Sequence, residues 1–168
     1  MRSINPIRLL ARVALLLGIT LAIQTLRLPT PVTGPLVNLM LILSTALAGA
    51  SWGTVIGLLT PWAGLFLGIL PPALAPAVPF IMAGNALYCL LFGLLNSRFK
   101  GGDLVGVGLG SVIKFALIAA PAGYLLKLPS PLVEVLLAPQ LINALIGGIA
   151  ALLLIRPLQQ TLFNGRKG

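Results

Sequence analysis

Long apolar runs alternate along the chain with short stretches that are rich in proline, glycine and basic residues. Most of the runs approach the ~20 residues that a helix needs to cross a bilayer. The intervening stretches, such as "LPTPVTGP" and "LPPALAPAVP", carry the residues that end helices. The pattern predicts six helices, over residues 7–26, 36–50, 52–70, 80–97, 104–126 and 132–156. The second is short, and "GASWG" after it is the weakest boundary.

The composition indicates a membrane protein. Of the 168 residues, 58% are hydrophobic and only 8% are charged, whereas a soluble domain carries roughly 25% charged residues. No connecting stretch is long enough to form a soluble domain. We therefore expect an all-α integral membrane protein with a single six-helix transmembrane domain over residues 1–168. The first apolar run could pass for a signal peptide, but no clear cleavage site follows it, and we interpret it as a retained span.

The basic residues divide unequally between the two sides of the predicted bundle. With six spans, two of them (Arg27 and Lys127) fall on one side and eight on the other. The eight are Arg2, Arg8, Arg12, Arg98, Lys100, Arg156, Arg166 and Lys167. If 36–70 were one span, the division would be four against six. Because basic residues accumulate in cytoplasmic loops, six spans with both termini cytoplasmic is the better interpretation. We expect a multi-pass protein of a prokaryotic plasma membrane.

Several classes of function are disfavoured. The net charge of +9 would suggest nucleic-acid binding in a soluble protein, but here the basic residues flank apolar runs, so we expect no nucleic-acid partner. The chain has no histidine, one cysteine (Cys89) and two acids (Asp103 and Glu134). These cannot build a metal cluster or a catalytic triad, and there is no Walker motif for ATP hydrolysis. We expect no enzymatic activity, no metal and no cofactor.

Lys114 lies near the middle of the apolar run "GLGSVIKFALIAAPAGYLL". A lysine at the centre of a membrane helix costs about 2.5–3.5 kcal/mol on insertion scales. Other polar residues fall at a similar depth, toward the side that carries few basic residues. A shared cavity, open to the outside and occupied by a ligand with an anionic group, would accommodate them. The candidate substrate-binding residues are Lys114, Asn38, Asn85, Tyr88, Gln140, Asn143 and Trp62.

Structural explanations for these residues remain open. The asparagines could join helices by hydrogen bonds, and Trp62 could pack in the core. Gln24 could face the lipid headgroups. Lys114 could snorkel or pair with Glu134. Pro139 is expected to kink the last helix beside Gln140.

A row of small residues marks one face of the first helix. Ala14, Gly18 and Ala22 are four residues apart and therefore share a face. Small residues at this spacing allow another helix to approach closely, either from within the bundle or from a partner protein. The last helix carries a similar set: Ala144, Gly147, Gly148 and Ala151.

These features together resemble the substrate-binding S component of energy-coupling factor (ECF) vitamin transporters. The resemblance covers nearly the whole chain and includes the runs "TGPLVNLMLILSTALAGASWGTVIGLLTP" and "GILPPALAPAVPFIMAGNALY". It implies an S-component-like bundle that binds a vitamin or similar micronutrient from outside. It also implies docking, through Ala14, Gly18 and Ala22, on a transmembrane coupling protein that carries two ATPase subunits. The family shares no single set of ligand-binding residues, so the resemblance implies no particular binding residue in this chain.

The lysine and the amides favour a small carboxylate such as pantothenate, nicotinate, lipoate or a folate-like acid. Two other functions stay open. A small channel or exporter subunit would need a polar path through the inner half of the bundle. A structural or assembly subunit would close the polar layer with side-chain pairs and leave no cavity.

Overall fold

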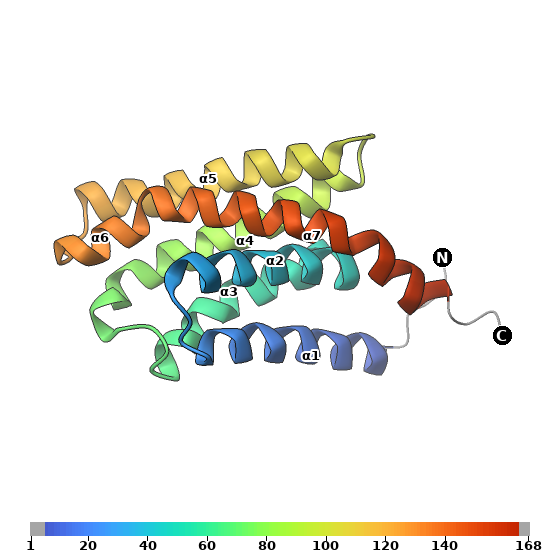
Figure 1. The fold of residues 1–168 in the computed structure, drawn as a ribbon, viewed down its shortest axis with the longest axis horizontal. Helices are drawn as coiled ribbons and strands as arrows, with labels where there is room; N and C mark the ends of the chain where they lie inside the picture. Colours follow the sequence, from blue (N-terminus) through green and yellow to red (C-terminus); the bar gives the residue numbers. More distant parts are fainter. Residues whose placement is uncertain (1–5, 165–168) are drawn as a thin grey trace.

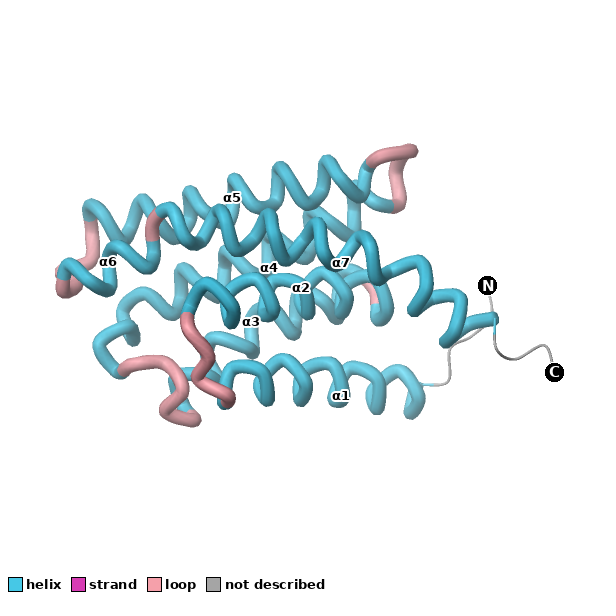
Figure 2. Tube along the Cα trace, in the orientation of Figure 1, coloured by secondary structure: helices cyan, strands magenta, loops and turns pink. Residues whose placement is uncertain are grey.

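The structure is a computed structural model that describes residues 6–164, with side chains to residue 161. Its described part is a bundle of helices without strands, and its loops gather at the two ends (Figures 1 and 2). The helices are α1 (Pro6–Thr25), α2 (Thr30–Ala48), α3 (Ala50–Phe66), the 3-10 helix η1 (Pro72–Ala77), α4 (Val78–Asn96), α5 (Gly102–Tyr124), α6 (Ser130–Leu136) and α7 (Ala138–Asn164).

Five helical segments of the described chain are long and apolar enough to cross a membrane. They comprise α1, α2, η1 with α4, α5, and α6 with α7. This supports an all-α, multi-pass membrane protein. Helix α3 is not among the five; it has 17 residues, which is the lower end of the range for a spanning helix, roughly 17–25.

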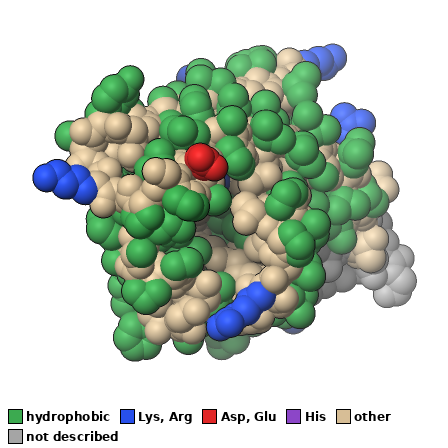
Figure 3. Space-filling model, turned by 60° about the vertical axis from the view of Figure 1, so that its left-hand side comes forward, with side chains coloured by type: hydrophobic (Ala, Val, Ile, Leu, Met, Phe, Trp, Pro, Cys, Tyr) green, Lys and Arg blue, Asp and Glu red, His purple; other side chains and the backbone are tan. Residues whose placement is uncertain are grey.

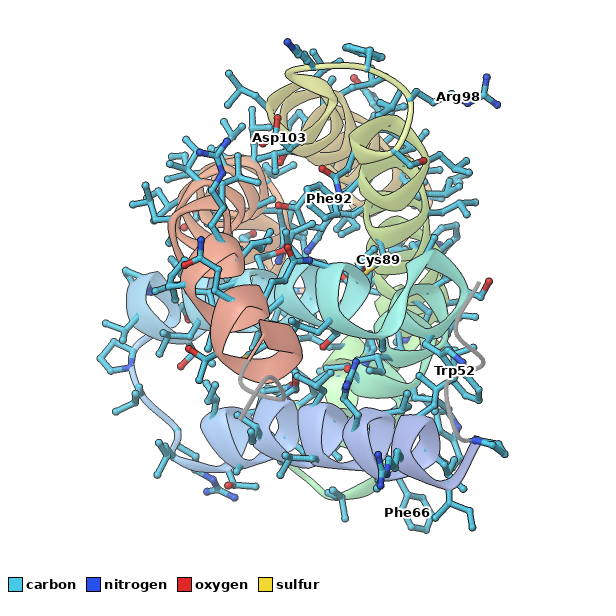
Figure 4. The ribbon with its side chains drawn as sticks, turned by 90° about the vertical axis from the view of Figure 1, so that its right-hand side faces the viewer. Trp52, Phe66, Cys89, Phe92, Arg98 and Asp103 are labelled. Carbon is cyan, nitrogen blue, oxygen red and sulfur yellow. The ribbon has the colours of Figure 1, made fainter. Side chains whose placement is uncertain are left out.

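Helix α1 begins, and α7 ends, at the same end of the bundle (Figure 1). The turn between α4 and α5, with Arg98, lies at this end too, which faces the viewer in Figure 4. We call it the basic end, and the opposite one the loop end. Arg12 lies near the basic end and donates a hydrogen bond to the carbonyl of Leu47, in the last turn of α2 (2.7 Å). This satisfies a carbonyl that has no partner within its own helix. Of the basic residues predicted for this side, Arg2, Arg166 and Lys167 lie outside the described residues.

Three glycines bring α5 against α4. Gly102, Gly106 and Gly110 are four residues apart, so they share one face of α5. A Cβ on Gly106 would lie 2.9 Å from the Cα of Phe92, and one on Gly110 would lie 2.8 Å from the Tyr88 ring. Lys114 occupies the next position of the series. The packing that the glycines permit therefore turns this lysine toward the interior.

Several predicted boundaries were wrong. Helix α3 ends at Phe66 rather than residue 70, and α7 continues to Asn164 rather than ending at residue 156. Helix α2 begins at Thr30 rather than residue 36. Pro31 lies in its first turn, where the missing N–H does least harm, and Pro35 is accommodated inside the helix. Pro29 caps it by accepting the N–H of Val32 (2.8 Å). The second helix is therefore not short: it has 19 residues.

The last predicted helix is broken rather than kinked. Leu137 takes a non-helical conformation (ψ −126°) and separates α6 from α7. Pro139 then falls in the first turn of α7, a position that proline tolerates well. As a result α6 covers the loop end as a separate short helix (Figure 1).

Candidate functional site

A cavity of about 620 Å³ occupies the loop end of the bundle. Figure 3 looks toward this end and shows a hollow with one acidic and one basic side chain at its rim. The polar residues that line the cavity are Gln24, Arg27, Thr30, Thr33, Asn38, Thr60, Asn85, Lys114, Gln140 and Asn143. Apolar side chains from α2, α4, α6 and the segment before α4 form the rest of the wall, among them Val37, Ile69, Leu74, Ile81 and Leu136. The lining thus comes from helices far apart in the sequence.

Lys114 is the most deeply placed charge in the lining. It is only 2% exposed, and its ammonium donates a hydrogen bond to Oδ1 of Asn38 (2.5 Å). The ammonium also lies 5.5 Å from the centre of the Tyr88 ring, within the range of a cation–π contact. Asn38 donates its own Nδ2 to the carbonyl of Gly34 (2.8 Å), which orients Oδ1 toward Lys114. Since an ammonium has three N–H donors, this arrangement leaves capacity for a ligand.

No carboxylate compensates this charge within the described part of the chain. Glu134 is exposed on α6 and forms no ion pair with Lys114. Asp103 accepts a hydrogen bond from the N–H of Leu104, near the basic end. In the structure, Lys114 therefore neither snorkels to the surface nor pairs with Glu134. Arg27 and Lys114 are the only charged groups in the described lining, so the cavity is suited to an anion.

Two buried amides of the lining have no hydrogen-bond partner among the described side chains and backbone groups. Asn85 on α4 is 3% exposed, and its Oδ1 is buried without a partner among the described residues. Asn143 on α7 is 5% exposed, and none of the described hydrogen bonds involves its side chain. Buried amides in apolar surroundings are ordinarily paired. Hydrogen bonds between helices therefore do not explain Asn85 or Asn143, whereas Asn38 is bonded across the bundle to Lys114.

Tyr88 lies beneath the cavity rather than in its lining. Its hydroxyl donates a hydrogen bond to the carbonyl of Ala144 (2.7 Å), and the residue is fully buried. Gly110 and Gly148 leave the space that the ring and the hydroxyl occupy. Tyr88 thus supports Lys114 from below and joins α4 to α7.

Trp62 is also absent from the lining. It is 52% exposed and stacks on Phe66, with 5.7 Å between ring centroids and 8° between planes. Its neighbour Pro61 lines the cavity instead. Because adjacent helical residues point about 100° apart, the inward face of Pro61 and Thr60 leaves Trp62 on the outside of α3.

The half of the bundle toward the basic end is filled with side chains. Phe92, Leu41, Ile42 and Ile56 are fully buried there, and Phe92 is visible between the helices in Figure 4. Cys89 is buried beside them and is a free thiol. These apolar side chains close the cavity on this side, although the buried hydroxyls of Ser44, Thr45 and Ser111 also lie in this half.

The sequence interpretation missed two groups of the site. Arg27 was counted only as a loop charge, and Gln24 was left as a residue that could face the headgroups, yet both line the cavity. Arg27 lies just beyond the end of α1, in a non-helical conformation (φ 48°), so helical spacing could not place it beside Gln24. The hydroxyls Thr33 and Thr60 gave no signal, since each bonds a backbone carbonyl in its own segment.

The small-residue face of α1 points away from the bundle. Ala14, Gly18 and Ala22 are exposed, and a Cβ on Gly18 would meet nothing within 4 Å. The opposite face of α1, with Leu16 and Thr20, is buried. The similar set on α7 behaves differently: Ala144, Gly147, Gly148 and Ala151 are buried. Internal packing therefore explains the α7 set but not the α1 set.

Comparison with known proteins makes no assignment: no family model, curated protein or solved structure matches the chain. The described residues contain no group of three or more side chains suited to hold a metal ion.

Proposed function

We propose that this protein is a membrane-embedded substrate-binding subunit that captures a small anionic micronutrient from outside the cell. The observation that carries the proposal is Lys114, a buried cation that lines a cavity without a carboxylate partner in the described chain. A carboxylate ligand would supply the missing counter-charge by a charge-assisted hydrogen bond. The apolar wall would bury the remainder of the ligand, as in most small-molecule sites.

Import in an ECF-type transporter fits the remaining features best. Within the described part of the chain the cavity lies at the loop end and the other half of the bundle is filled, so the chain would need a second protein to pass its ligand on. The exposed small-residue face of α1 offers a surface for the transmembrane coupling protein. Two ATPase subunits bound to that protein would supply the energy. In this proposal α3 is the sixth span, both termini are cytoplasmic, and the membrane is the plasma membrane of a prokaryote.

The alternatives are weaker on specific grounds. A structural subunit would pair its polar layer internally, but Asn85 and Asn143 have no partner in the described chain. A channel or exporter subunit would need a continuous polar path below Tyr88. The large side chains of Phe92, Leu41 and Ile56 fill the bundle there, and the polar groups among them are small hydroxyls such as those of Ser44 and Ser111.

Native mass spectrometry of the protein, purified gently from its own host, tests the proposal. We expect a co-purifying small acid on the wild type and its loss from Lys114→Met, which keeps the length of the side chain but removes the charge. Lys127→Met, at an exposed position near the loop end, is the matched control and should retain the acid. An empty wild type that also ignores added carboxylates would contradict the proposal.

A further inference from the structure

We infer that the ligand is not a simple apolar acid. Its neutral part carries hydrogen-bonding groups, and Asn85 and Asn143 recognise these groups. This inference rests on the proposed function, since it concerns the neutral part of the anion that Lys114 would hold. In this inference, Asn85 and Asn143 select the ligand by its neutral part, and Lys114 binds its anionic group.

The first observation is the isolation of the Asn85 amide. An amide buried without a partner costs about 1–3 kcal/mol relative to a satisfied one. Asn85 is 3% exposed and lines the cavity, yet its Oδ1 has no partner among the described residues. Its Nδ2 makes none of the described hydrogen bonds either and is not fully buried, so a ligand oxygen or ring nitrogen in the cavity would accept a hydrogen bond from it.

The second observation is that Asn143 repeats this arrangement on another helix. It lines the same cavity at 5% exposure, and its side chain takes part in no described hydrogen bond. The side chain packs over Gly34, where a Cβ would collide with it. Each amide offers both donors and an acceptor, so the two residues favour a ligand with an amide, hydroxyl or ring-nitrogen group.

The third observation places Asn85 beside the charge. A Cβ on Gly84 would meet Cγ of Lys114 at 3.2 Å, so the stem of the lysine packs on α4 at the residue before Asn85. Lys114 and Asn85 line the same cavity, so a ligand whose carboxylate binds Lys114 has the Asn85 amide in the wall around it. An alkyl chain there would leave that amide unpaired, and a site built on unpaired polar groups rejects such a ligand.

Binding of two matched pairs of acids tests the inference. Hexanoyl-β-alanine and decanoate have the same chain length, but only the first has an amide group. Pantothenate and lipoate form a second pair, polar against apolar. Isothermal titration calorimetry in detergent would compare the wild type with Asn85→Leu, an apolar side chain of similar size. Asn96→Leu, exposed at the far end of the same helix, is the control.

We expect the wild type and Asn96→Leu to bind the polar acid of at least one pair about tenfold or more tightly than the apolar acid. Asn85→Leu should lose most of that ratio. Equal binding of both acids in each pair by the wild type would overturn the inference but leave the proposed anion site intact. The same holds if the ratio persists in a doubly substituted Asn85→Leu, Asn143→Leu protein. Failure of the wild type to bind any of the four acids would contradict the proposed function itself, and the inference with it.

Discussion

Lys114 on α5 and Asn38 on α2 are joined by a hydrogen bond across 76 positions of sequence. The acceptor is a neutral amide, whose orientation is fixed by a second hydrogen bond to Gly34. A neutral acceptor satisfies one N–H of the lysine without cancelling its charge. Asn38 is therefore the structural partner of Lys114, and the counter-charge is left for a ligand to supply.

Exchange of that amide for a carboxylate should therefore block ligand binding without unfolding the protein. In Asn38→Asp the new carboxylate would pair with Lys114 and take the place of the ligand anion. We expect acid affinity to fall at least about tenfold, the effect of losing one charge-assisted hydrogen bond. Calorimetric titration and thermal unfolding in detergent would measure both effects. Unchanged acid affinity would contradict the role assigned to Lys114.

Asn38→Leu provides the contrast to that variant. It removes the acceptor and leaves the buried ammonium unsatisfied, so we expect the free energy of unfolding to fall by about 1–3 kcal/mol. Asn38→Asp should be clearly more stable than Asn38→Leu in the same detergent. Equal stability of the two variants would show that the hydrogen bond between residues 38 and 114 is unimportant.

The glycine face of α5 should be intolerant of a single methyl group. In Gly106→Ala the new Cβ would lie 2.9 Å from the backbone of Phe92, so α5 must move away from α4. We expect a loss of about 1–3 kcal/mol, typical of overpacking. Gly108→Ala is the control two residues away, where nothing lies within 4 Å. That variant should be neutral or slightly stabilised, because alanine is the better helix former.

The exposed small-residue face of α1 should matter for transport and not for binding. Gly18→Leu fills no space within the bundle, so unfolding and ligand titration should be unchanged. If α1 docks on a coupling protein, the added side chain will reduce co-purification of that protein and uptake of substrate by cells. Gly123→Leu, also exposed and without neighbours within 4 Å, should leave both unaffected. Equal uptake by the two variants would argue against docking through α1.

Labelling of single cysteines would test the orientation of the bundle. Cys89 is fully buried, so Cys89→Ala gives a background without a reactive thiol. In intact cells, a membrane-impermeant maleimide should label Lys127→Cys at the loop end. It should reach Lys100→Cys, at the basic end, only after lysis, as the positive-inside rule requires. The reverse result would place the cavity on the cytoplasmic side and contradict capture from outside.

The sequence was informative where a residue was costly in lipid. Lys114, Asn85, Asn143 and Gln140 were recognised from depth alone, and all of them line the cavity. The depth of a residue does not tell which way its side chain points around the helix axis. Trp62 was expected to face the cavity because it shares the depth of Thr60, but it points the other way. The rotation of Lys114 was available in the sequence, because Lys114 continues the four-residue spacing of Gly102, Gly106 and Gly110.

Helix ends were harder to predict where proline was taken only as a breaker. Pro31 and Pro35 lie inside α2, and Pro139 opens α7 instead of bending it. The separation of α6 from α7 depends on the conformation of Leu137; Pro139 was the local signal for a break here, but it was interpreted as a kink. These are the positions that shape the mouth of the cavity, so its outline could not be derived from the pattern of apolar residues.

Because no carboxylate of the described chain pairs with Lys114, ligand binding should also affect the thermal stability of the protein. Without ligand, the folded state keeps the Lys114 ammonium beside the neutral side chains of Asn38 and Tyr88. An anion that binds the folded state alone stabilises it by RT ln(1 + [L]/Kd), about 2.7 kcal/mol when its concentration is one hundred times Kd. The melting temperature of the protein would then rise with the concentration of its substrate in the medium. A nutrient that fills the cavity would act as a removable part of the core.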